Sequence, residues 1–260
     1  MHRTIAGARA LVTGASGGLG QAIALELARQ GAQLVLLARR ADKLQAVADT
    51  ISTLGGRVET VVGDVNDPQA RQTAIERSNQ AFGGLDILVN NAGVGALVRF
   101  EASTAEQIRR VLDTNLLSPI ELTRAALPLL KAGRQPIVVN ISSILGHRAT
   151  PQNSAYCASK FALRGWSDSV RIELAPQGID LLVVSPGSTA TEFWNHLVDR
   201  QGTVPWKLES AMPADRVARE IVRAIRRGRR ELIPGWRNRW FVRLGYFCPG
   251  LLDRVMRRFA

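Results

Sequence analysis

Two residues with the chemistry of a proton-transfer pair stand four positions apart in the segment "SAYCASKF" at 154–161, Tyr156 and Lys160. Both residue types are scarce, because the chain has two tyrosines and only four lysines among its 34 basic residues. Residues four apart on a helix share one face, so a helix here would place the phenol beside the ammonium. A phenol has a pKa of about 10, and a neighbouring positive charge lowers that value. The spacing predicts that Tyr156 is a general acid or base and that Lys160 adjusts its pKa.

A glycine-rich turn, "TGASGGLG" at 13–20, joins the first apolar run of the chain to the first amphipathic segment. Gly14, Gly18 and Gly20 leave the backbone free to turn sharply and to approach a ligand closely. The helix expected to begin here has unpaired N–H groups and a positive dipole end, which suit a pyrophosphate. The turn is therefore a candidate dinucleotide site, and the alternative is a tight connection that binds nothing.

The end of the second expected strand carries Arg39 and Arg40. A cofactor with a free ribose 2′-hydroxyl would require an aspartate or glutamate at this point. A guanidinium matches the geometry of a 2′-phosphate instead. We therefore expect NADP(H) in preference to NAD(H), and the alternative is a pair of solvated arginines that open a helix.

Apolar runs that alternate with amphipathic segments are expected to position these residues. We expect strands at 8–14, 32–39, 57–65, 85–93, 135–143, 179–187 and 230–234. We expect helices at 19–31, 41–55, 68–82 and 104–130, and one from Tyr156 to Leu174. Apolar strands separated by helices are typical of a parallel sheet that is covered on both faces. The pattern predicts an α/β fold with one domain over residues 1–260 and a doubly wound, mainly parallel sheet of about seven strands.

The helix expected over 104–130 carries two further signals. Ser103 and Glu106 have the spacing of a capping box at its N-terminus, and Pro119 is expected to bend it. Asn115 is a poor helix former in a helix interior, where it indicates at least a local kink.

The composition fits a globular protein, because 46% of the 260 residues are hydrophobic and 22% are charged. Cys157 and Cys248 form neither a disulfide framework nor a metal-ligand spacing, so we expect a reducing, cytoplasmic compartment and no metal site. No apolar run is long enough for a signal peptide or a membrane span. Most of the net positive charge lies in residues 216–260, which hold 13 arginines and three acidic residues, whereas the rest of the chain holds 21 basic and 19 acidic residues. We therefore expect no nucleic-acid partner.

Taken together, these motifs resemble the short-chain dehydrogenase/reductase family. The resemblance rests on the glycine turn at 13–20, "NNAG" at 90–93, Asn115, Ser143, the Tyr156–Lys160 pair and "PG" at 186–187. Their order and separations agree from about residue 8 to residue 191. The resemblance implies a Rossmann fold, a nicotinamide cofactor, and an enzyme that interconverts an alcohol and a carbonyl.

The resemblance also assigns roles to single residues. Tyr156 would be the proton donor or acceptor, Lys160 would also hold the nicotinamide ribose, and Ser143, 13 residues before Tyr156, would bond the substrate oxygen. Ser142 is the second choice for the serine, and Asn115 would hold a water that links Lys160 to solvent. The family's cofactor contacts fall on Gly14, Ser16, Gly18, Leu19, Gly20, Arg39, Asp64, Val65, Asn91, Ala92, Gly93, Tyr156, Lys160, Pro186, Gly187 and Thr191.

For two of these residues the alternative is a purely structural role without cofactor contact. Asn91 could only brace the sheet, and Asp64 could be an ordinary residue at a strand end.

Two segments are expected to shape the substrate side. Residues 188–213 match the family's lid and carry Phe193, Trp194 and Trp206, which favour a hydrophobic substrate such as a steroid, a lipid or a long-chain carbonyl. His147 is expected in the pocket wall, and the alternative is a proton shuttle. Aromatic residues and arginines at helical spacing make 236–260 a basic amphipathic extension, divided at Pro249. Such a segment could lie on a membrane surface, which would place the protein at the periphery of the inner membrane; it could instead cover the cleft or form a subunit interface.

The resemblance implies a homodimer or homotetramer, with the helix over 104–130 and the helix after Tyr156 as the contact surface. The alternative to an enzyme is a non-catalytic NADP-binding or membrane-associated scaffold protein. Such a protein would have no need of Tyr156.

Overall fold

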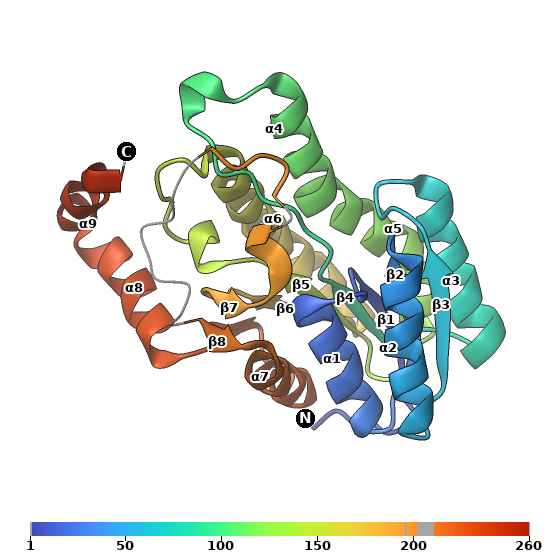
Figure 1. The fold of residues 1–260 in the computed structure, drawn as a ribbon. Coiled ribbons are helices and arrows are strands. Elements are labelled where there is room, and N and C mark those ends of the chain that lie inside the picture. The colour runs from blue at the N-terminus through green and yellow to red at the C-terminus, as the bar shows by residue number, and fades with distance from the viewer. Residues whose placement is uncertain (1, 196, 202–210, 260) are drawn as a thin grey trace.

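The structure is a computed structural model that describes residues 2–195, 197–201 and 211–259. Within these residues seven strands form one sheet in which every neighbouring pair is parallel (Figure 1). The order reverses between β1 and β4, as in doubly wound sheets that bind dinucleotides, and this confirms the predicted α/β fold. The strands, in order across the sheet, are β3 (Val58–Val62), β2 (Gln33–Ala38), β1 (Arg9–Thr13), β4 (Ile87–Asn90), β5 (Ile137–Ile141), β6 (Asp180–Val184) and β9 (Glu231–Leu232).

Helices cover both faces of the sheet. Successive residues of a strand point to opposite sides, and the buried strands are apolar on both sides, so each face needs a layer of helices. Val12 of β1 lies in one apolar cluster with α1, α2 and α7, whereas its neighbour Leu11 lies in another with α3, α5 and α6. The helix α7 is an addition to the expected elements. The helices are α1 (Gly18–Arg29), α2 (Ala41–Thr53), α3 (Pro68–Phe82), α4 (Ala105–Leu112), α5 (Ser118–Lys131), α6 (Ser154–Leu174) and α7 (Ala214–Arg226).

The helix expected over 104–130 is two helices, α4 and α5, joined by a π-helical turn at Asp113–Leu117. The capping box predicted for Ser103 and Glu106 is wrong by one residue. Thr104 and Gln107 make it, since each side chain accepts a hydrogen bond from the other's backbone N–H. Ser103 instead donates its hydroxyl to the carbonyl of Phe100 at 2.6 Å, at the end of the preceding 3₁₀ turn.

Two further parts of the chain extend past the carboxyl ends of the strands. The short strands β7 (Thr189–Ala190) and β8 (Met212–Pro213) pair at the base of the expected lid. The helices α8 (Trp236–Phe247) and α9 (Pro249–Met256) form the tail, and Pro249 begins α9 as the sequence predicts. Figure 1 shows both tail helices on the side of the molecule away from α3. No helix in the described part of the chain is long and apolar enough to cross a membrane.

Candidate active site

A cavity of about 930 Å³ opens at the carboxyl ends of the strands. Open α/β sheets bind their ligands at this edge, where the strand order reverses. Every residue expected to contact a cofactor lines the cavity, and so does Ser143. The structure thus brings together Gly14, Ser16, Gly18, Leu19, Gly20, Arg39, Asp64, Val65, Asn91, Ala92, Gly93, Ser143, Tyr156, Lys160, Pro186, Gly187 and Thr191.

The glycine turn forms a cradle that side chains would fill. Gly14 has φ +66°, and a Cβ there would lie 2.9 Å from the Cα of Ala92. A Cβ on Gly20 would lie 2.3 Å from the carbonyl oxygen of Gly14. The helix α1 begins at Gly18 with no side-chain cap and no acidic residue in its first turn, so its N–H groups face the cavity edge without a carboxylate. The cradle therefore fits the pyrophosphate of a dinucleotide.

Replacing Gly20 by alanine is expected to lower stability by about 1–3 kcal/mol, since the new Cβ must displace backbone. It is also expected to weaken binding of NADPH, because the displaced carbonyl belongs to the cradle. Thermal unfolding and NADPH fluorescence titration measure the two effects. The matched control is Gly165→Ala in the interior of α6, where a Cβ meets no atom within 4 Å; it is expected to stabilise by about 1 kcal/mol. An unchanged Gly20→Ala protein would contradict the close contact.

The helix α6 places Tyr156 and Lys160 on one face, and the Lys160 Nζ atom lies 5.7 Å from the centre of the Tyr156 ring. Both side chains are buried. Burial raises the pKa of Tyr156, and a side-chain hydrogen bond with Ser143 opposes that shift only in part. The expected lowering of this pKa is therefore wrong for the structure as it stands. A raised pKa keeps the phenol protonated at neutral pH, which is the form that donates a proton.

Lys160 is held by the end of β5, since its Nζ donates to the carbonyl of Ile141 at 2.8 Å. Burial lowers the pKa of Lys160 to about 8, so the amine is close to titration near neutral pH. Ser143 lines the cavity and its hydroxyl oxygen accepts from the N–H of Leu145 at 3.1 Å. Ser142 also lines the cavity, but its hydroxyl is engaged by the carbonyl of Lys160 at 3.2 Å. The geometry thus favours Ser143 over Ser142 as the partner of Tyr156.

Asn115 is fully buried in the π-helical turn and is absent from the cavity lining. Its amide clamps Val94, donating to the carbonyl at 2.8 Å and accepting from the N–H at 2.9 Å, and it also donates to Ser159 at 3.0 Å. A Cβ on Gly93 would lie 3.2 Å from the Asn115 oxygen and 3.7 Å from the Lys160 Nζ. Asn115 therefore positions the backbone next to Lys160, and its water-holding role stays a prediction.

The two arginines after β2 differ in their contacts. Arg39 pairs with Asp64 at 3.6 Å, and both residues line the cavity. Arg40 reaches back over the glycine turn, where its Nε lies 3.3 Å from the hydroxyl oxygen of Ser16. It also pairs with Glu192 of the lid at 3.3 Å. Arg40 is thus a further cavity residue with the chemistry for a 2′-phosphate. Its place above the turn comes from its orientation at the start of α2, which sequence spacing does not give.

Asn91 braces the sheet and also lines the cavity, so bracing is not its only place in the structure. Its Nδ2 donates to the carbonyl of Thr13 at 2.9 Å, and its backbone N–H donates to the Thr13 hydroxyl at 3.0 Å. These bonds join the ends of β1 and β4 beside the glycine turn.

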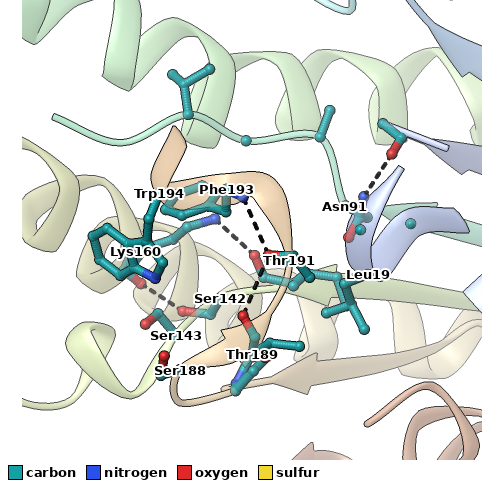
Figure 2. A pocket seen from close by; sticks show the side chains of 18 of the residues that line it. Leu19, Asn91, Ser142, Ser143, Lys160, Ser188, Thr189, Thr191, Phe193 and Trp194 are labelled. Atoms are coloured by element: carbon teal, nitrogen blue, oxygen red, sulfur yellow. Dashed lines mark hydrogen bonds between the residues drawn. The ribbon is translucent and has the colours of Figure 1, made fainter. Parts of the chain in front are cut away.

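The lid contributes aromatic side chains to the cavity. Phe193 packs against Tyr156 with ring centres 5.8 Å apart, and Trp194 meets Phe193 edge-on at 5.3 Å. In Figure 2 the side chains of Ser143 and Lys160 gather in the same pocket as Phe193 and Trp194. Trp206, the third expected lid aromatic, lies outside the described residues, as do 196 and 202–210 of the expected lid.

His147 is absent from the cavity wall where it was expected. Its Nε2 lies 2.9 Å from the hydroxyl oxygen of Ser185, and burial lowers its pKa to about 4. The neutral ring therefore joins the loop after β5 to the end of β6.

The tail forms one wall of the cavity, a contribution that the sequence left as one of several alternatives. Asn238 sits against the turn after β6, where a Cβ on Gly187 would lie 2.3 Å from its Oδ1. Helical spacing revealed the apolar tail positions but not which of them face the cleft. The cavity-lining residues of the tail are Trp236, Arg237, Asn238, Phe241 and Met256.

Known proteins resemble this chain over most of its length. Residues 8–202 match the short chain dehydrogenase family. The chain is 36% identical over 247 residues to "11-beta-hydroxysteroid dehydrogenase-like 3" of Arabidopsis thaliana, covering 94% of this chain and 78% of that protein. It is 31% identical over 263 residues to "Ketoacyl reductase HetN" of Nostoc sp., covering 99% of this chain and 91% of that protein.

Solved structures agree with these sequence relatives. A short chain dehydrogenase from Burkholderia cenocepacia in complex with NADP has a TM-score of 0.78 and 34% identity, covering 89% of this chain and 97% of the other. A short chain dehydrogenase/reductase from Burkholderia phymatum in complex with NAD has a TM-score of 0.87 and 25% identity, covering 96% of each chain. Because the family match extends over residues 8–202, the chain belongs to the short-chain dehydrogenase/reductase family of oxidoreductases, which use a nucleotide cofactor.

Proposed function

We propose that this protein is an NADP(H)-dependent oxidoreductase that interconverts a carbonyl and a secondary alcohol on a hydrophobic substrate. The bound nicotinamide supplies or accepts the hydride. In reduction the Tyr156 hydroxyl donates its proton to the substrate oxygen, and Ser143 hydrogen-bonds the same oxygen as negative charge develops. Lys160 supports the phenolate that remains, because its ammonium lies on the same face of α6.

One observation carries the proposal: the buried side chain of Tyr156 lies in a single cavity with Ser143, Lys160 and the glycine cradle. The position of Arg40 over the cradle supports NADP(H). The apolar lid residues Phe193 and Trp194 support a hydrophobic substrate. The hydroxysteroid dehydrogenase-like relative is compatible with such a substrate. The ketoacyl reductase relative is the reason to test a 3-oxoacyl thioester as well.

A panel of carbonyls tests the proposal. Steroid ketones, long-chain ketones, a 3-oxoacyl thioester and small aldehydes are each supplied with NADPH, and its absorbance is followed. We expect the fastest oxidation of NADPH with the steroid or long-chain ketones, and slower turnover when NADH replaces NADPH. No turnover of any carbonyl with either cofactor would overturn the proposal.

The rate of carbonyl reduction is expected to fall as the pH rises through about 8, the value to which burial lowers the pKa of Lys160. Below that pH the ammonium is intact and supports the phenolate; above it the neutral amine does not. Tyr156 does not cause the fall, since its own pKa is raised and its phenol stays protonated in this range. The measurement is kcat/KM for reduction against pH at saturating NADPH. A profile that stays flat through pH 8 contradicts the role given to Lys160.

A further inference from the structure

The helix α8 has two faces with different surroundings. Asn238 and Phe241 line the cavity and Val242 is buried, so one face packs on the protein. The opposite face is exposed and carries Trp236, Trp240, Leu244 and Phe247, which recur at helical spacing. Trp240 is 61% exposed and Phe247 is 83% exposed, so most of the surface of these large side chains faces outward.

Exposed apolar side chains are also present on α9 and in the turn that follows it. There the protein side is held by Asp253, which pairs with Arg148, and by the carbonyl of Phe259, which accepts from Gln152 at 3.0 Å. We call the outward set the apolar stripe; it comprises Trp236, Trp240, Leu244, Phe247, Leu251, Val255 and Phe259.

Arginines accompany the apolar stripe. The guanidinium of Arg237 lies 5.5 Å from the ring of Trp236, and that of Arg243 lies 5.8 Å from the ring of Trp240. In the part of the chain that the structure describes, no carboxylate forms an ion pair with an arginine of residues 236–259, whereas Arg216 and Arg219 on α7 are both paired. The tail's exposed arginines are Arg237, Arg239, Arg243, Arg254, Arg257 and Arg258.

We infer that the apolar stripe docks on an anionic lipid surface. A helix that presents aromatic side chains beside arginines lies in the lipid interface with its apolar face buried, and the arginines meet the anionic headgroups. A second copy of this chain fits the surface poorly, because a two-fold contact would set arginines against arginines. The oligomer contact was expected on a different surface, the segment 104–130 and α6, where Leu117 and Phe161 are exposed.

The docked geometry also gives a route for substrate. Trp236 belongs both to the apolar stripe and to the cavity wall, so the cavity adjoins the docked surface. A hydrophobic carbonyl dissolved in the lipid would then enter beside Trp236 without crossing water. This route rests on the proposed function, whereas the docking does not.

Vesicle sedimentation of the full chain tests the docking. The protein is mixed with vesicles of phosphatidylcholine alone, or of phosphatidylcholine and phosphatidylglycerol in equal parts, at low and at high salt. We expect it to pellet with the anionic vesicles at low salt and to partition less at high salt. The variant Trp240→Glu/Phe247→Glu is expected to lower the partition coefficient more than about tenfold. The matched control Leu54→Glu, an exposed leucine (52%) at the end of α2, is expected to leave it unchanged.

A second variant, Arg254→Gln/Arg258→Gln, tests the docking independently in case the first variant misfolds. It is expected to lower the partition coefficient about tenfold and to make partitioning less dependent on salt. NADPH fluorescence titration of each variant reports folding. A full chain that stays in the supernatant with anionic vesicles at low salt overturns the inference. A chain that stays there and forms an oligomer which Trp240→Glu/Phe247→Glu dissociates also overturns it, in favour of a second copy. Turnover of a water-soluble ketone without vesicles tests the proposed function separately, since it does not depend on docking.

Discussion

Replacing Tyr156 by phenylalanine is expected to lower kcat for carbonyl reduction by about 10²- to 10⁴-fold, the usual contribution of a general acid. The variant removes one hydroxyl from a buried side chain and keeps the ring that packs on Phe193 at 5.8 Å. The glycine cradle and Arg40 are untouched, so the dissociation constant for NADPH is expected to stay within a few-fold of the parent. Stopped-flow absorbance at saturating NADPH measures the first quantity and fluorescence titration the second.

The chain provides its own control in Tyr246, the only other tyrosine. Tyr246 lies on α8 and is 62% exposed, and it does not line the cavity. Tyr246→Phe is expected to leave kcat unchanged with a water-soluble ketone. If Tyr156→Phe retained full turnover, another proton donor would act at the substrate oxygen and the proposed chemistry would fail. If it lost turnover together with NADPH binding, the hydroxyl would serve the fold or the cofactor site instead.

The direction of the Tyr156 pKa shows where spacing alone fails. Four residues on a helix give proximity, and proximity of an ammonium lowers the pKa of a phenol. Burial acts in the opposite direction and depends on what covers the ring, here the lid residue Phe193 and the core around α6. The same burial lowers the pKa of Lys160 to about 8 and so weakens the charge that was expected to dominate. The balance of the two effects requires the tertiary structure.

The sheet and the cradle could be predicted because local patterns determine them. Continuous apolar runs separated by amphipathic helices specify a parallel sheet. The connections between its parallel strands are right-handed, which limits the possible strand orders. Gly14 and Gly20 lie where two stretches of backbone come into contact and leave no room for a side chain, so the spacing of the glycines predicts the shape of the turn. The capping box failed by one residue because Ser103 and Thr104 both precede the helix, and only the 3₁₀ turn at Phe100 decides between them.

The tail could be predicted only in part. Its helices and their break at Pro249 follow from local pattern, but that pattern does not show which of the apolar positions face the protein. Contact with the turn at Gly187 places Asn238 at the cavity, which Trp236 and Phe241 also line, while the rest of the apolar stripe stays outside it. That division comes from packing between segments about 50 residues apart, which helical spacing does not encode.

Replacing Arg40 by glutamine is expected to lower kcat/KM for NADPH by about 10- to 100-fold, since a hydrogen bond to a charged group is worth about 1.5–3 kcal/mol. The value for NADH is expected to change little, because NADH has no 2′-phosphate. Arg39→Gln is expected to have the smaller effect, since Arg39 is already paired with Asp64 at 3.6 Å. The matched control is Arg77→Gln, which removes a surface ion pair with Glu59 of similar length (3.2 Å) outside the cavity.

The lid residue Glu192 sharpens this test, because it holds both Arg40 at 3.3 Å and Lys43 at 3.1 Å. A 2′-phosphate that binds Arg40 must compete with this carboxylate for the same guanidinium. Glu192→Gln removes the competing charge, so it is expected to tighten NADPH binding a few-fold in the background of Arg40 and to do nothing for NADPH in Arg40→Gln. Fluorescence titration of the four proteins of this cycle gives the coupling between the two residues. If the effects of the two substitutions simply add, Arg40 does not bind the phosphate, and the preference for NADP(H) would have to come from Arg39.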